Sequence, residues 1–470
     1  MSASNRPSTL GELKSSGWQS VPVKEEIRAN AVVRVASGLP LFDGVHGYES
    51  TVMPQLENAL LAGHDIVFLG ERGQAKTRII RSLTGLLDEW MPIVGGSEIN
   101  DDPYNPVSRH ARDLVAAEGD STPIDWMHRS DRFGEKLATP DTSIADLIGE
   151  VDPIKVAEGR YLSDELTLHY GLVPRTNRGI FAINELPDLA ERIQVGLLNV
   201  LEERDVQIRG YKIRLPLDVL LVASANPDDY TNRGRIITPL KDRFGSQIRT
   251  HYPLEITTEI DIMRQEARPL SIGDVLVKVP HFMEEIVATM SHTARGSSQV
   301  NQRSGVSVRL SVSNLEVLAA NAVRRALRSG ERIVVPRVCD LDALAASTSG
   351  KIEIESLDDG REGSVIETML KASVLQVYKT RVTPAEVKDV VAAFEEGTVV
   401  HSGEDVASGE IARFIDAVPS LRPTVLGLTD GDESPAAVAS AVEFVLEGLH
   451  LSKRLNKDSS GLSSTYRGRS

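Results

Sequence analysis

The sequence has few of the residues that disulfides, metal cages and membrane spans require. One cysteine, Cys339, stands among 470 residues, so no disulfide can form within the chain and a reducing compartment is expected. The ten histidines are scattered, which predicts no metal site other than a magnesium ion bound with a nucleotide. No apolar run approaches the length of a membrane span, and the N-terminus lacks an apolar signal region. We therefore expect a cytoplasmic protein without a membrane span.

Acidic residues outnumber basic residues, and aromatic residues are scarce. The net charge of −15 would repel a phosphate backbone, so no direct binding to nucleic acid is expected. Basic residues gather only near the C-terminus, where serine and glycine are also frequent, and a solvated, disordered tail is predicted there. Aromatic residues make up only 4% of the chain, so its cores must be built from Leu, Ile, Val and Ala.

The apolar patterns divide the chain into four parts. Residues 1–40 are predicted to form a short lead-in. Over residues 41–255, apolar runs alternate with helical stretches, which predicts an α/β domain with a mostly parallel sheet covered on both faces. The runs expected to form strands include residues 65–69, 179–184 and 219–225. Residues 256–400 have helical periodicity and predict a second domain, and residues 401–470 are predicted to be a helical extension that ends in the disordered tail.

The strongest local signal follows the first of these strands. A glycine-rich loop leads into a helix, and its residues are Gly70, Glu71, Arg72, Gly73, Gln74, Ala75, Lys76 and Thr77. In a P-loop of this kind, backbone N–H groups and the positive end of the helix dipole point at phosphate oxygens. Lys76 would reach the β- and γ-phosphates, and the Thr77 hydroxyl would bind magnesium. The loop therefore predicts ATP and Mg²⁺ as cofactors, with a simple turn before a helix as the alternative.

Ala75 departs from the usual pattern of such loops, in which a third glycine precedes the lysine. Alanine is tolerated there if its backbone is close to helical. We therefore expect a near-helical conformation at Ala75.

Five segments, in this order, resemble the magnesium-chelatase ATPase subunit and MoxR-type proteins of the AAA+ family. They are the loop at 70–77, the acidic strand with its approach at 172–185, a predicted hairpin within 198–216, the strand end at 222–227 and the segment at 239–245. The resemblance covers about residues 40–330. It implies an α/β fold with a P-loop AAA+ parallel sheet core and a C-terminal all-helical lid domain.

The resemblance assigns roles to the residues that end the second strand. In the family this strand ends in Asp-Glu, where the sequence here has Asn184 and Glu185. Glu185 would polarise the attacking water, and Asn184 would hold magnesium through a bound water. Because Asn184 brings no negative charge, two interpretations stay open: slow hydrolysis with Glu185 intact, or binding of ATP mainly as a switch.

Three further residues of the α/β domain receive roles in the same way. Asn226 would hydrogen-bond the γ-phosphate or the attacking water, with a buried structural amide as the alternative. Arg243 would act as an arginine finger that reaches a neighbouring subunit, with a surface salt bridge as the alternative. Arg178 is a second interface candidate, and a structural role is equally open.

The remaining assignments lie outside the sheet. Arg309 would contact the phosphates from the lid side, and Arg303 competes for that role. Val45 and Gly47 fall where the family binds the adenine, with a turn before a helix as the alternative.

The resemblance implies an ATP-driven ring, expected to be a hexamer, that remodels a partner or drives metal insertion in it. The partner would be a separate protein with a von Willebrand factor A domain. One alternative is an ATP-gated scaffold with little turnover, which Asn184 favours. The other is an enhancer-type transcription activator, which would need a Gly-Ala-Phe-Thr-Gly-Ala loop and a helix-turn-helix domain that the sequence does not contain.

Overall fold

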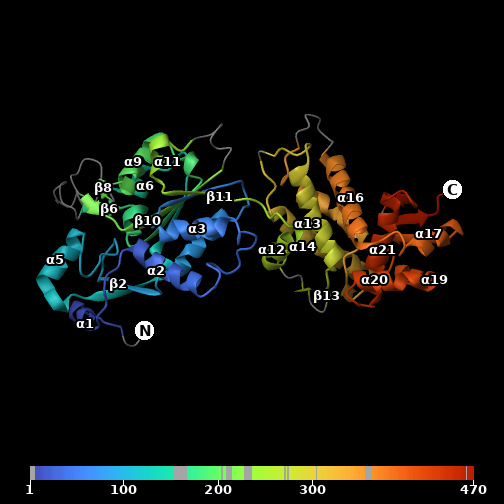
Figure 1. Cartoon of the computed structure of the whole chain (residues 1–470), viewed down its shortest axis with the longest axis horizontal. Coiled ribbons are helices and arrows are strands. Elements are labelled where there is room, and N and C mark those ends of the chain that lie inside the picture. Colours follow the sequence, from blue (N-terminus) through green and yellow to red (C-terminus); the bar gives the residue numbers. More distant parts are fainter. Residues whose placement is uncertain are drawn as a thin grey trace. The chain divides into compact units, whose positions relative to one another are not determined.

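The computed structural model describes residues 6–151, 167–202, 205–207, 214–226, 235–268, 271–272, 275–302, 304–354, 362–461 and 463–469 (Figure 1). The chain forms two compact units, Met1–His251 and Tyr252–Ser470. Within the described residues, no helix is both long enough and apolar enough to cross a membrane.

A five-stranded parallel sheet is the centre of the first unit. Its strands lie in the order β11-β1-β10-β7-β4. Their bounds are β1 Ile66–Leu69, β4 Phe133–Leu137, β7 Gly179–Asn184, β10 Val219–Ala225 and β11 Ser246–Arg249. The three predicted strands are β1, β7 and β10, and every residue of these three is buried, as expected for a sheet covered on both faces.

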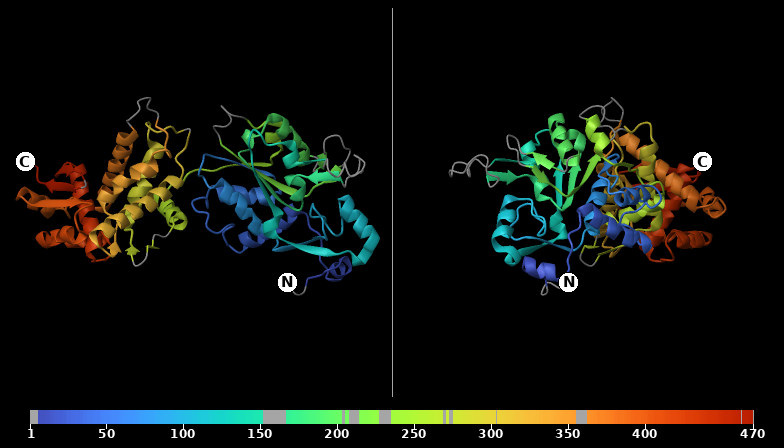
Figure 2. Two further views of the ribbon diagram at one scale, coloured as in Figure 1. Left: turned by 180° about the vertical axis from the view of Figure 1, so that it is seen from behind. Right: turned by 60° about the vertical axis from the view of Figure 1, so that its left-hand side comes forward.

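Helices cover both faces of this sheet (Figure 2). Alternating side chains of β1 enter two separate cores, Ile66 and Phe68 on one face and Val67 and Leu69 on the other. The first core is shared with α2 (Val23–Ala36), α3 (Val52–Leu61) and α4 (Lys76–Ser82). The second core is shared with α9 (Glu191–Glu202) and α11 (Thr238–Arg243).

Smaller elements complete the first unit outside the five-stranded sheet. The hairpin predicted within 198–216 is present as β8 and β9, and its turn lies outside the described residues. The helix predicted after the loop is the short α4, which is followed by a 3-10 turn at Leu83–Leu86. The other elements of the unit are α1 Leu10–Ser15, β2 Trp90–Val94, α5 Arg109–Glu118, β3 Ile124–His128, α6 Ile144–Leu147, β5 Gly149–Val151, β6 Leu168–Tyr170, α8 Leu172–Arg175, β8 Asp205–Gln207 and β9 Arg214–Pro216.

The lead-in is part of the first unit. Helix α2 buries Val23, Ile27 and Ala31 in the core. The carboxylate of Glu26, on this helix, accepts hydrogen bonds from both terminal nitrogens of Arg132, at 2.7 and 2.6 Å. The Arg132 side chain is 1% exposed and that of Glu26 is 9% exposed, so the pair is almost completely withdrawn from water.

The second unit is mainly helical. Its long helices pack around one core in which the rings of Phe282 and Phe444 stack at 4.6 Å. Its helices are α12 Ile256–Glu266, α13 His281–Gly296, α14 Arg309–Ser329, α15 Leu344–Thr348, α16 Glu362–Arg381, α17 Lys388–Glu395, α18 Ser408–Ala412, α19 Phe414–Ala417, α20 Arg422–Leu428 and α21 Pro435–Leu451. It is not all-helical as predicted, because a small three-stranded sheet joins β12 (Ser271–Ile272), β13 (Val275–Val277) and β14 (Ile333–Val334).

The C-terminal residues are strands rather than the predicted disordered tail. Strands β16 (Asn456–Ser460) and β17 (Ser463–Arg467) form a hairpin that pairs with β15 (Val399–Gly403). Tyr466 is 1% exposed, and its hydroxyl donates to Glu447 of α21 at 2.6 Å. The sequence predicts disorder because the segment is mostly polar, and burial of the one residue Tyr466 cannot be seen from its composition.

Replacing Glu26 with alanine should destabilise the first unit by about 3 kcal/mol, because Arg132 would stay buried with its charge unpaired. All three tryptophans of the chain lie within residues 1–251, so denaturation followed by tryptophan fluorescence reports on this unit. Glu25→Ala is the matched control, since it removes an exposed pair with Arg28 and should cost less than about 1 kcal/mol. Equal losses in the two variants would contradict the role assigned to Glu26.

Candidate functional site

The loop after β1 lies at the carboxyl ends of the parallel strands. The Gly70 N–H donates to the Ala225 carbonyl at the end of β10 (3.1 Å), which ties the start of the loop to the neighbouring strand. Gly73 has a φ of 76°, a left-handed conformation that glycine adopts without strain. Helix α4 then begins at Lys76. Strand, loop and helix thus follow one another in the predicted order.

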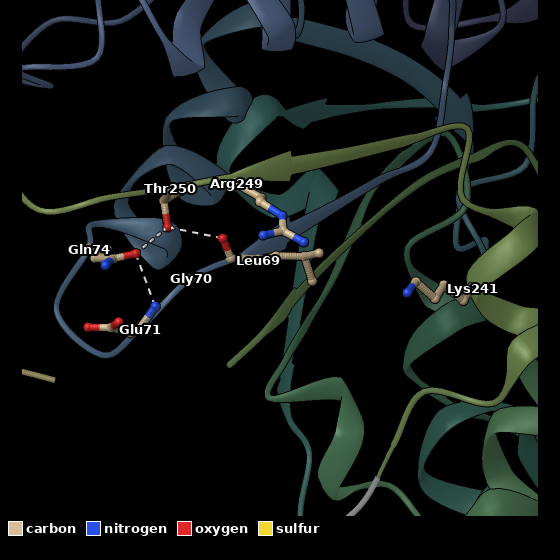
Figure 3. Close-up of a pocket in the computed structure, with 7 residues that line it drawn as sticks. All are labelled: Leu69, Gly70, Glu71, Gln74, Lys241, Arg249 and Thr250. Carbon is tan, nitrogen blue, oxygen red and sulfur yellow. Dashed lines mark hydrogen bonds between the residues drawn. The ribbon is translucent and has the colours of Figure 1, made fainter. Parts of the chain in front are cut away.

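Gln74 braces the loop from inside (Figure 3). Its Oε1 accepts hydrogen bonds from the Glu71 backbone N–H (3.0 Å) and from the hydroxyl of Thr250, the residue after β11 (2.8 Å). Gly70 has no room for a side chain, because a Cβ there would collide with that hydroxyl and with Gln74 Oε1. The oxygen of Gln74, a predicted cofactor-binding residue, therefore holds the loop itself in shape.

Ala75 has a different backbone from the one that the sequence predicts. Its φ of 53° and ψ of 14° are left-handed rather than near-helical. Gly73 is also left-handed, whereas Gln74 between them is not. Alternation of left-handed with other residues is the backbone pattern from which concave anion sites are built. The left-handed conformation costs an alanine roughly 1–2 kcal/mol. The backbone of Ala75 is therefore strained in this loop.

The Lys76 ammonium group lies inside the loop. It donates to the carbonyls of Gly70 and Glu71, the latter at 2.8 Å, and to Asn226 Oδ1 at 3.2 Å. The side chain is 7% exposed, and a charge so far withdrawn from water needs acceptors of this kind. Asn226 directly follows β10, so the contact brings together two predicted site residues that lie 150 positions apart.

The carboxyl end of β7 carries Asn184 and Glu185, which stand where the family has Asp-Glu. Asn184 is the last residue of the strand, and Glu185 follows it with a left-handed φ of 55°. The Glu185 N–H donates to Ser224 Oγ on β10 (3.2 Å), and the Ser224 hydroxyl donates to Asn184 Oδ1 (3.2 Å). A strained backbone at a non-glycine residue is frequent where the position of a side chain matters for function.

Asn184 also contacts a residue that has no role in the sequence motifs. Its Nδ2 donates to Glu135 Oε1 on the adjacent strand β4, at 2.5 Å. The second oxygen of Glu135 accepts from Arg81 Nε on α4, at 2.8 Å. No sequence signal points to Glu135, because the contact depends on which strand lies beside β7.

The segment that contains Val45 and Gly47 reaches the loop through Tyr48. The Tyr48 hydroxyl lies 2.8 Å from the carbonyls of both Gln74 and His251. Burial raises the pKa of Tyr48 above its usual range, so the hydroxyl stays protonated and can donate. Val45 packs against the core beneath, and Gly47 has a φ of 80°. The predicted adenine-side segment is thus attached to the loop.

Comparisons with known proteins can now be set beside this geometry. A family model described as the sigma-54 interaction domain matches residues 157–240. The magnesium-chelatase subunit ChlI of Nostoc sp. is 27% identical over 240 residues, which cover 48% of this chain and 58% of that protein. The magnesium-chelatase 38 kDa subunit of Cereibacter sphaeroides is 26% identical over 235 residues, which cover 47% of this chain and 62% of that protein.

The chain belongs to the AAA+ ATPase family. It is a distant relative of the chelatase ATPase subunits and of sigma-54 activator domains, and it spans little more than half the length of the curated relatives it matches. Among solved structures, NtrX from Brucella abortus in complex with ATP is 15% identical, with a TM-score of 0.40 over 74% of this chain and 66% of that chain. We call residues 1–251 the AAA+ unit.

A cavity of about 320 Å³ lies beside the loop of the AAA+ unit (Figure 3). It is lined by Leu69, Gly70, Glu71, Gln74, Lys241, Arg249 and Thr250. Lys241 and Arg249 come from α11 and β11 and are not among the predicted site residues. These two residues bring positive charge to the cavity, and Glu71 brings a carboxylate.

The prediction that Arg178 lies at a subunit interface is wrong. Arg178 is 5% exposed, and its guanidinium donates to the Pro92 carbonyl at 2.8 Å. Its backbone carbonyl accepts from Arg132 at 2.9 and 2.7 Å. Burial lowers the pKa of Arg178. A side chain held inside the unit in this way cannot reach a neighbouring subunit, so its role is structural.

Two other predicted arginines, Arg243 and Arg309, lie at the surface. Arg243 ends α11, and its side chain is 39% exposed. Arg309 is exposed at the start of α14 in the second unit. Arg303 lies outside the described residues. The nucleotide contacts assigned to these residues stay predictions.

Replacing Ala75 with glycine should stabilise the AAA+ unit by about 0.5–1 kcal/mol, because glycine adopts the left-handed conformation without strain. Denaturant unfolding followed by tryptophan fluorescence measures the change. Ala29→Gly is the control: Ala29 is exposed within α2, and glycine there should cost about 1 kcal/mol. Destabilisation of similar size in both variants would argue against a left-handed Ala75.

Proposed function

We propose that the AAA+ unit binds ATP with Mg²⁺ and hydrolyses it, and that the chain works as a ring that drives a conformational change in a partner protein. The observation that carries this proposal is the position of the Lys76 ammonium, inside a loop of left-handed turns and in contact with Asn226. An ammonium group beside the start of a helix suits the phosphates of a nucleotide.

The residues present fit this cofactor. Gly70 lets the loop close tightly on the Gln74 and Thr250 side chains, with which a Cβ would collide, and so keeps the loop in the shape that a phosphate-binding turn requires. Lys76 would bind the β- and γ-phosphates, and Gly73, Gln74 and Ala75 would offer backbone N–H groups. Val45 and Gly47 would lie at the adenine.

Metal binding and hydrolysis would fall to the side chains at the strand ends. The Thr77 hydroxyl would bind Mg²⁺ directly, and Asn184 would hold it through water. Glu185 would orient and polarise the attacking water, and Asn226 would hold either that water or the γ-phosphate. Bound magnesium supplies charge neutralisation at the phosphates.

A ring is proposed because hydrolysis in such a site gains from a cation supplied by a second subunit. Arg243, exposed at the end of α11, would be that cation, and Arg309 of the helical unit would reach the phosphates as the lid moves. From the family resemblance we propose a hexamer and a partner with a von Willebrand factor A domain. Remodelling of that partner, or metal insertion by it, would be the work that hydrolysis drives.

An ATP-gated scaffold with little turnover is the second candidate function. It is favoured by Asn184, whose neutral amide stands where the family has a carboxylate. The match to the sigma-54 interaction domain also brings an enhancer-type activator into consideration. The Gly-Ala-Phe-Thr-Gly-Ala loop that such an activity requires is absent from the sequence.

Steady-state ATP hydrolysis by the full chain with Mg²⁺ tests the proposal. Glu185→Gln should retain ATP binding and lower kcat by about a hundredfold or more, because general-base assistance is lost.

Lys76→Ala should lose ATP binding measured by titration calorimetry. Tight binding by the Lys76 variant would overturn the P-loop assignment. Binding without turnover in the wild-type chain would favour the scaffold.

Arg243→Ala should lower kcat at least about tenfold while ATP affinity stays within about twofold, because an arginine finger acts on a neighbour's transition state. In mixtures with wild-type subunits, activity per wild-type subunit should fall. Arg109→Ala removes an exposed arginine paired with Asp113 on α5 and should change neither quantity. Activity strictly proportional to the wild-type fraction would contradict a role in trans.

A further inference from the structure

Three neighbouring strands place polar side chains in one row. Ser224 on β10, Asn184 on β7 and Glu135 on β4 are joined by hydrogen bonds of 3.2 and 2.5 Å. Ser224 is 2% exposed and Asn184 9%, and the side chain of Glu135 is 20% exposed. The row lies near the carboxyl ends of the strands, where Glu185 and Asn226 also lie.

The partners of Asn184 fix the orientation of its amide. An ionised carboxylate can only accept hydrogen bonds, so the NH₂ of Asn184 must face Glu135. The Asn184 oxygen then faces the Ser224 hydroxyl, which donates to it. The negative charge of this row is therefore that of Glu135, and it lies one hydrogen bond away from the position where the family has its aspartate.

Helix α4 shows how this charge relates to the loop. Arg81 of α4 contacts Glu135 at 2.8 Å, so this face of the helix is turned toward β4. Thr77 lies four positions before Arg81 and hence on the same face, one turn nearer the loop. The predicted magnesium-binding hydroxyl and the Glu135 carboxylate thus belong to the same side of the helix–sheet contact.

The ion pair of Glu135 with Arg81 gives little reason for a charged carboxylate at this position, because a neutral oxygen could accept the Asn184 amide equally well. The Arg81 side chain is 63% exposed, and pairs of this kind contribute at most about 1 kcal/mol. Magnesium, in contrast, is commonly held by one or two carboxylates together with water and substrate phosphates.

We propose that Glu135 supplies the negative charge of the magnesium site and holds a metal-bound water from the strand beside Asn184. The family's aspartate charge is in effect moved from the end of β7 to β4. This inference rests on the proposed ATP site and assigns a metal-positioning residue within it. It would keep magnesium binding, and with it turnover, compatible with Asn184.

The test replaces Glu135 with glutamine, which keeps the shape and an acceptor oxygen for the Asn184 amide but removes the charge. Mn²⁺ binding to the full chain in the presence of ATP is measured by electron paramagnetic resonance. Glu135→Gln should weaken Mn²⁺ affinity about tenfold or more, the size of effect seen when a group that supports a metal site is lost. ATP affinity measured in EDTA should be unchanged.

Two further variants separate charge from structure. Arg81→Ala removes the same ion pair but leaves the carboxylate, and it should not weaken Mn²⁺ binding. The exchange variant, Glu135→Gln with Asn184→Asp, returns the charge to β7 and should recover Mn²⁺ affinity to within about threefold. Thermal unfolding of each variant checks that the fold is intact.

The outcomes distinguish the two levels of the proposal. If wild-type chain binds no ATP in EDTA or with metal, the proposed function fails. If it binds ATP and Mn²⁺ but Glu135→Gln binds Mn²⁺ equally well, the assignment of Glu135 is overturned and the function stands. Equal weakening by Glu135→Gln and Arg81→Ala, or no recovery in the folded exchange variant, also overturns the assignment.

Discussion

Parallel pairing of β1 with β10, and of β10 with β7, is the constraint on which the site depends. Parallel strands end at the same edge of a sheet, so residues that follow them converge however far apart they are in sequence. The loop after β1, Asn226 after β10 and Glu185 after β7 meet for this reason. The register places Leu69 opposite Ala225 and Ala223 opposite Ile183, so the three strands end close together.

The loop is held from several directions before any nucleotide is considered. Gln74 joins its backbone to Thr250 after β11, Tyr48 joins it to the segment before α3, and the Lys76 ammonium bridges its carbonyls to Asn226. A left-handed alanine persists within this set of contacts, since the surrounding bonds determine the backbone more strongly than the local preference of Ala75. Such preorganisation lowers the entropic cost of ordering the loop around phosphates.

Membership of the AAA+ family accounts for the order of these elements, and the departures from its pattern give this chain its own features. The amide of Asn184 faces a carboxylate on the neighbouring strand instead of carrying a charge itself. Arg178, a candidate interface residue by sequence, is buried against the Pro92 carbonyl and cannot serve there. A sequence motif therefore predicts the place of a residue in the fold, but the role of its side chain depends on the residues that surround it.

Local pattern alone determined much of this protein. The apolar runs that form β1, β7 and β10, the glycine-rich loop with Lys76 and Thr77, and most long helices of the second unit follow from periodicity and turn chemistry. Tertiary structure decided what depends on partners far away in sequence. It set the conformation of Ala75, the contact of Glu135 with Asn184, the bracing by Tyr48 and Thr250, and the burial of Tyr466 that orders the C-terminal strands. Single polar residues of this kind leave no period in the sequence, because their energies arise only when strands from separate parts of the chain are paired.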